Sequence, residues 1–199
     1  MGTSDVTRTR TPTSTANVLL NVRGFVVLTC AVAVIATAIG AGNGRRISLP
    51  QHRVSVVVPG RWHMIYERVN GVVDPVTLFT ASTFPLRVKS ADQAGSSGVC
   101  SKALQRAWRA DGAYVQVAEE RDGASRKRML RRVAKRPRHF KLTARGGGGL
   151  CTPANSGEIS FQEGGRAFYV FYGIGLKASR ATRAEAAALL DSLRIAPRG

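Results

Sequence analysis

Acidic side chains are scarce in this chain of 199 residues, which contains 12 Asp and Glu against 30 Lys and Arg. Histidine and cysteine are rarer still, with three of each. The histidines are dispersed, and neither an H-E-x-x-H pair nor a four-ligand cysteine set is present, so we expect no metal and no cofactor. A G-x-S-x-G nucleophile elbow is also missing. These absences exclude the common zinc and serine-hydrolase motifs, and they leave open a catalytic site assembled across the fold.

An apolar run without charge occupies residues 24–42 and reads GFVVLTCAVAVIATAIGAG. As a helix it would extend about 28 Å, close to the ~30 Å hydrocarbon core of a bilayer. It is expected to be a retained transmembrane anchor or the core of a cleaved signal peptide, with Ala36-Thr37-Ala38 as cleavage site. A buried core helix is the third interpretation. Arginines flank the run on both sides, so the positive-inside rule does not orient it.

The run divides the chain into four parts. We predict a disordered basic tail at 1–23, the membrane-length helix at 24–42, a flexible tether at 43–50 and one domain at 51–199. The domain is expected to lie outside the cytoplasm, either on a single-pass anchor in the cell membrane or secreted after cleavage.

Within the domain, alternating and β-branched segments predict about seven strands. They are 53–58, its return strand 62–67 after a Pro-Gly turn, 76–82, 113–119, 140–144, the alternation around 159–161, and 167–172. An apolar stripe predicts a helix at 101–109, and Thr182-Arg-Ala-Glu185 predicts the capping box of a second. The fold class is therefore α+β, with a mostly antiparallel sheet of about 5–7 strands and two helices packed on it.

Two local patterns that imitate functional motifs do not carry function. Residues 173–178, GIGLKA, match the dinucleotide fingerprint G-x-G-x-x-A, but the chain ends before a second parallel strand can follow. Glu119 and Glu120 are neighbours on a predicted strand, so they point to opposite faces and cannot form an acid/base pair by themselves.

Cys100 and Cys151 are the two cysteines of the domain. Export places them in an oxidising compartment, where we expect them to form a disulfide. Two free buried thiols are the alternative if the domain faces the cytoplasm.

The strongest chemical signal is the basic segment 121–145, which holds eleven Lys or Arg and one acid, Asp122. Arginine forks suit phosphate and carboxylate oxygens. The anion-binding candidates are Arg126, Lys127, Arg128, Arg131, Arg132, Lys135 and Arg136. The alternative is a solvated loop whose charge serves no ligand.

Several motifs in a fixed order resemble a family of short exported or membrane-anchored actinobacterial proteins. They are V-x-V-x-x-P-x-x-W at 54–62, D-P-V at 74–76, A-S-x-F-P at 81–85, Cys100, D-G-A at 111–113, R-P-x-x-F at 136–140, Cys151, G-R-A-F at 165–168 and L-L-D-S-L-R at 189–194. The opening and the ending are also similar to PsbP-like and LpqN-like domains. The resemblance implies an exported α+β sandwich and brings no activity with it.

These observations favour a non-catalytic binding domain of the cell envelope whose basic surface meets anionic lipid or envelope polymer. A hydrolase-like envelope enzyme without a recognisable motif is the first alternative. A nucleic-acid binder is the second, and it requires a domain that faces the cytoplasm; export makes nucleic acid an unexpected partner.

Intact mass of the native protein tests the export prediction. A retained anchor preserves the mass of the full chain, whereas signal cleavage removes residues up to Ala38. Reduction should add the mass of two hydrogen atoms if Cys100 and Cys151 are paired. An unchanged mass, with both thiols open to alkylation, would contradict the disulfide.

Overall fold

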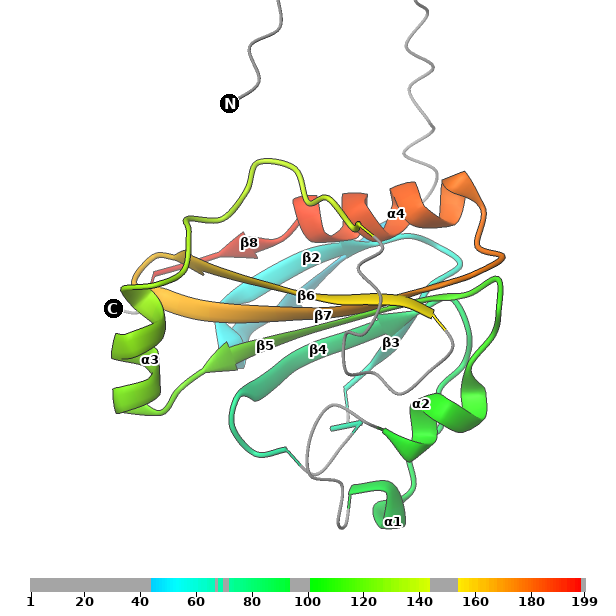
Figure 1. The fold of residues 1–199 in the computed structure, drawn as a ribbon, viewed down its shortest axis with the longest axis horizontal. Helices are drawn as coiled ribbons and strands as arrows, with labels where there is room; N and C mark the ends of the chain where they lie inside the picture. The colour runs from blue at the N-terminus through cyan, green and yellow to red at the C-terminus, as the bar shows by residue number, and fades with distance from the viewer. Residues whose placement is uncertain (1–43, 67, 70–71, 94–100, 144–153, 198–199) are drawn as a thin grey trace, which may run out of the picture. The chain divides into compact units, whose positions relative to one another are not determined.

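The computed structural model describes residues 44–66, 68–69, 72–93, 101–143 and 154–197 (Figure 1). All of the described residues belong to one compact unit. None of the described helices is long and apolar enough to cross a membrane. The helix predicted at 24–42 and both cysteines of the predicted disulfide lie outside the described residues.

The described part of the chain is α+β, with two antiparallel sheets and four α-helices. The smaller sheet has the order β1-β2-β8 and consists of β1 (Arg45–Leu49), β2 (Val54–Val58) and β8 (Arg194–Ile195). The larger has the order β3-β4-β5-β7-β6 and consists of β3 (His63–Ile65), β4 (Val76–Ser82), β5 (Ala113–Glu120), β6 (Ala154–Glu163) and β7 (Arg166–Gly175). The predicted single sheet is thus corrected to two sheets.

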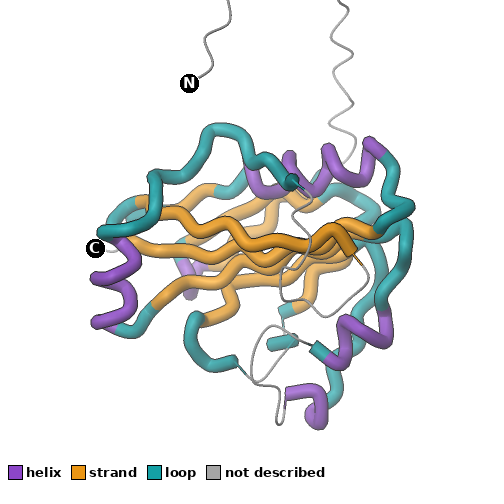
Figure 2. Tube along the Cα trace, viewed as in Figure 1, coloured by secondary structure: helices purple, strands orange, loops and turns teal. Residues whose placement is uncertain are grey.

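The helices cover both faces of the larger sheet (Figure 2). Helix α4 (Arg180–Asp191) packs against β2 and β5, and α3 (Gly123–Leu130) packs against β7. Helices α1 (Ser90–Gln93) and α2 (Lys102–Ala107) lie on the other side of the larger sheet from α4 (Figure 1). A 3-10 helix, Pro50–His52, joins β1 to β2.

Alternation along β5 separates two apolar cores. Val115 and Val117 point into the main core, where they meet the smaller sheet and Leu189 of α4. Tyr114 points the other way and packs with Leu104 of α2 in a second cluster. Both faces of the neighbouring strand β7 are therefore covered, which explains why its sequence is apolar on both sides.

The predicted strand at 62–67 is present as β3 but has a different partner. It pairs with β4 in the larger sheet instead of returning along β2. Both edges of β2 are already occupied, by β1 and by β8. The prediction of a flexible tether at 43–50 is also wrong, because Arg45–Leu49 forms β1.

Two further predictions about local structure are corrected. Within 140–144, the described residues 140–143 form no strand, because the Phe140 N–H donates to Asp191 Oδ1 (2.8 Å) and the Phe140 ring is buried. The N-cap of α4 is Ser179, whose hydroxyl oxygen accepts the Thr182 N–H at 3.0 Å, and not Thr182. Glu185 accepts instead from Arg61 (2.6 Å) and from the indole of the buried Trp62 (2.9 Å).

The two sheets are joined by one buried guanidinium. Arg166 of β7 is 2 % exposed and forms two parallel bonds to Glu119 of β5, Nε to Oε1 at 2.8 Å and Nη2 to Oε2 at 2.9 Å. It also donates to the carbonyls of His52 (2.9 Å) and Ala196 (3.1 Å), which flank the strands of the smaller sheet. A charge buried this deeply needs such a full set of partners.

The Arg166→Met variant should therefore be severely destabilised, since it leaves the Glu119 carboxylate buried without its main partner. Removal of one member of a buried pair costs roughly 3–5 kcal/mol of the free energy of unfolding. The matched control is Arg61→Met, which breaks a half-exposed pair with Glu185 and should cost less than about 1 kcal/mol. Urea denaturation measures the free energy of unfolding of both variants. An equal decrease in the two would contradict the conclusion that Arg166 stabilises the fold more than the half-exposed Arg61 does.

Candidate functional site

Helix α3 takes its position from polar contacts at its two ends. The Asp122 carboxylate caps the first turn by accepting the Ser125 N–H at 2.8 Å, and this bond lowers the pKa of Asp122. Gln162 of β6 donates its side-chain amide to the carbonyls of Leu130 (2.9 Å) and Val133 (2.7 Å) at the other end. Met129 is the one side chain of α3 that is fully buried. The weak apolar stripe of the sequence reflects this shallow contact.

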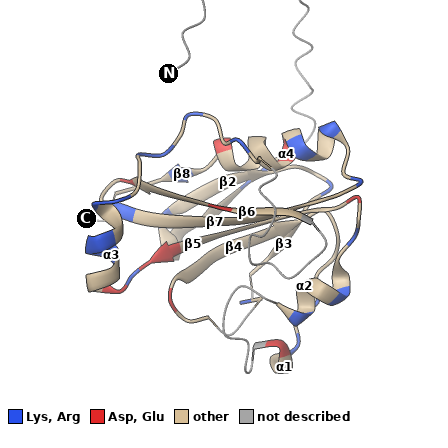
Figure 3. Ribbon diagram, in the orientation of Figure 1, with Lys and Arg blue, Asp and Glu red and all other residues tan. Residues whose placement is uncertain are grey.

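The structure distributes the anion-binding candidates over α3 and the segment that follows it. Three lie on the helix itself, where Figure 3 shows basic residues gathered. Arg131 and Arg132 lie just beyond its end, and Lys135 forms an isolated bridge with Gln162 of β6. Among the described residues, none of these six candidates forms a salt bridge. They are Arg126, Lys127, Arg128, Arg131, Arg132 and Lys135.

Arg136, the seventh candidate, has its guanidinium occupied. It donates to the carbonyls of Leu190 (3.1 Å), Asp191 (2.9 Å) and Leu193 (2.6 Å) at the end of α4, and it pairs with Glu163 at 3.3 Å. Carbonyl oxygens at the end of a helix attract a cation. Arg136 therefore fastens the basic segment to α4, which no local pattern in the sequence indicated.

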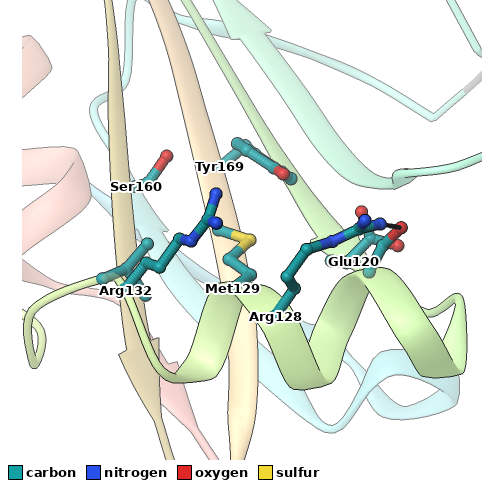
Figure 4. A pocket seen from close by; sticks show the side chains of 8 residues that line it. Glu120, Arg128, Met129, Arg132, Ser160 and Tyr169 are labelled. Atoms are coloured by element: carbon teal, nitrogen blue, oxygen red, sulfur yellow. Dashed lines mark hydrogen bonds between the residues drawn. The ribbon is translucent and has the colours of Figure 1, made fainter.

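A groove of about 280 Å³ opens between α3 and the face of the larger sheet (Figure 4). Met129 and Val133 supply apolar surface, and β6 and β7 supply the hydroxyls of Ser160 and Tyr169. The remaining lining residues are Glu120, Ser125, Arg128 and Arg132. Of these residues, the sequence pattern indicates only the two arginines as anion-binding candidates, because residues of different strands can be assigned to one site only once the strand order is known.

Glu120 is the buried acid of this groove. The preceding residue, Glu119, faces the core on the other side of β5, as the alternation of the strand predicts. Burial raises the pKa of Glu120, and a hydrogen bond with the Asp74 carboxyl raises it further. Burial also raises the pKa of Tyr169, with the charge of Glu120 as the next cause.

Within the described residues, no cluster of three His, Cys, Asp or Glu side chains is arranged to hold a metal ion. Gly175 of the 173–178 pattern has a structural explanation, because a Cβ there would collide with the carbonyl oxygen of Ala110. Comparison of the chain with models of protein families, with curated proteins and with solved structures found no match.

Replacing Glu120 by Gln should change how stability depends on pH. A carboxyl whose pKa is raised in the folded state favours folding most while it is protonated, and that contribution is lost as pH rises through the raised pKa. Relative to wild type, Glu120→Gln should thus gain stability as pH rises from about 4 to 8. Urea denaturation across that range measures the gain.

The control is Glu158→Gln, which removes a carboxyl from an exposed position on β6 of the same sheet. It should leave the pH profile of the wild type unchanged. A profile for Glu120→Gln that runs parallel to wild type would contradict the raised pKa of Glu120 in the folded protein.

Proposed function

We propose that the described domain is a non-catalytic binding module of the cell envelope that binds phosphate-bearing anionic ligands through α3 and the residues after it. The observation that supports this most strongly is the set of six Lys and Arg side chains on α3 and just after it that have no acidic partner among the described residues. Five of them are exposed, and Arg126 is half-buried. Charges that are neither paired nor buried remain available to a ligand.

The way the segment is attached also supports binding. The Arg136 guanidinium, the Gln162 amide and the Asp191 carboxylate hold the backbone on β6 and α4. The free cations thus stand on a supported backbone, so less conformational entropy is lost when a ligand binds. This attachment argues against the alternative of a solvated loop.

Lipid headgroups and phosphodiester polymers of the envelope share the chemistry that this surface would recognise. Arginine forks bind the non-bridging oxygens of a phosphate in pairs. Near an anionic surface each Lys or Arg contributes about 1 kcal/mol, and the contribution weakens with salt.

An enzyme that uses the groove is the second candidate, favoured by the raised pKa values of Glu120 and Tyr169. Its described lining contains no histidine or lysine that could activate the Ser160 hydroxyl, which donates to Glu158 at 3.0 Å. The groove therefore supports binding better than nucleophilic catalysis.

Substitution of Arg126, Lys127, Arg128, Arg131 and Arg132 by Gln should abolish binding to anionic ligands. At about 1 kcal/mol for each residue, the loss exceeds roughly a thousandfold in affinity. The full chain in nanodiscs of neutral lipid would be titrated at low salt with phosphatidylglycerol vesicles and, separately, with soluble polyphosphate. Preference for one of these two probes identifies lipid or polymer as the source of the phosphate.

The matched control carries five Gln substitutions at other basic positions of the same domain and has the same net charge. These positions are Arg87, Lys102, Arg109, Lys177 and Arg180, which are exposed. The control should retain most of the binding. Equal losses in the two variants would show that binding follows net charge alone, and unchanged binding in the first would contradict the proposal.

A further inference from the structure

The groove beneath α3 contains cationic and hydroxyl donors that the fold itself does not use. The Arg132 guanidinium extends from the end of α3 toward Ser160 and Tyr169 (Figure 4). Among the described residues, neither this guanidinium nor the Tyr169 hydroxyl has a hydrogen-bond partner. In contrast, the guanidiniums of Arg136 and Arg166, which also contact the sheets, are bonded to carbonyls and carboxylates.

The other side of the groove adds a second cation beside an acid. Arg128 lies alongside Glu120 (Figure 4) and donates to the Ser125 hydroxyl at 3.1 Å, which orients its guanidinium. Glu120 is buried, accepts the Asp122 N–H at 3.0 Å and is hydrogen-bonded to the Asp74 carboxyl. The raised pKa of Glu120 weakens the repulsion that its carboxyl would exert on a bound anion.

We propose that this groove is a binding site for a single phosphate group, a monoester or diester, held by the Arg132 guanidinium and the Tyr169 hydroxyl with Arg128 as second cation. The planar fork of Arg132 can engage two phosphate oxygens, and the other two donors approach from different elements. The volume of about 280 Å³ lies just below the range of drug-sized pockets, which suits a phosphate with a short organic substituent.

The apolar lining fits a substituent on that phosphate. Met129 and Val133 of the helical side form one wall of the groove, and the ring of Tyr169 stacks on Phe171 at 5.9 Å along β7. A glycerol or sugar carbon can therefore contact apolar surface while its phosphate meets the arginines. The inference rests on the proposed function and deepens it: the broad basic surface attracts a polyanion, and the groove seats one of its phosphates.

The test is calorimetric titration of the full chain, in neutral-lipid nanodiscs, with glycerol 1-phosphate. Arg132→Gln should weaken binding by at least about tenfold, because a charge-assisted bidentate bond is lost. Tyr169→Phe removes only a hydroxyl that has no partner in the described fold, and it should weaken binding by about three- to tenfold with unchanged stability.

The matched controls are Arg131→Gln and Lys127→Gln, which remove the same charge from exposed neighbours that do not line the groove. They should change the affinity for glycerol 1-phosphate by less than about twofold. Equal losses in Arg131→Gln and Arg132→Gln would overturn the groove site, and so would a Tyr169→Phe variant that binds like wild type or a wild type that binds no glycerol 1-phosphate.

Polyphosphate binding by the same variants separates the two proposals. One outcome is that the five-residue Gln variant no longer binds polyphosphate, while Arg132→Gln and Arg131→Gln bind glycerol 1-phosphate equally. The groove proposal then fails and the surface proposal stands. If the five-residue variant retains polyphosphate and Arg132→Gln alone loses glycerol 1-phosphate, the groove is a site in its own right and the broad surface is not.

Discussion

The Arg166 guanidinium holds the described fold together, because it bonds groups from both sheets at once. It pairs with Glu119 within the larger sheet and reaches the carbonyls of His52 and Ala196 beside the smaller one. A buried charge tolerates little displacement, since each lost partner exposes an uncompensated desolvation cost. The apolar core between the sheets supplies most of the driving force for folding, and this guanidinium fixes how the sheet ends meet.

Polar contacts also hold the basic segment 121–145 in place near the surface. Its own apolar residues bury little area, so polar side chains from the neighbouring elements hold it. Gln162 caps the end of α3, Arg136 binds the end of α4, and Asp191 accepts the N–H of Phe140. Arg136 is used in this attachment, and the other six anion-binding candidates form no salt bridge among the described residues. Because Arg136 attaches the segment to α4, the other anion-binding candidates remain available at the surface.

The groove lies where the strand that carries the buried ion pair, β5, ends beside the basic segment. Strand β5 sends Glu119 into the core and Glu120 toward α3, so one strand supplies both the buried ion pair and the acid of the groove. Arg132 and Tyr169 come to the same space from the end of α3 and from β7. The proximity of acid, cations and hydroxyl therefore depends on the strand order β5-β7-β6 and on the packing of α3 against β7.

Alternation, periodicity and charge among neighbouring residues predict the strands β2, β4, β5 and β7, the helix α2 and the basic character of the segment after β5. Contacts between distant segments set the partner of β3, the pairing of Arg45–Leu49 as β1, the attachment made by Arg136 and the groove at Glu120 and Tyr169. The physical reason is that strand pairing and buried polar contacts join residues far apart in the chain, as Arg166 and His52 are. The local sequence pattern indicates which face of a segment is polar and which is apolar. Which segment packs against each face depends on the other segments of the chain that can occupy that position.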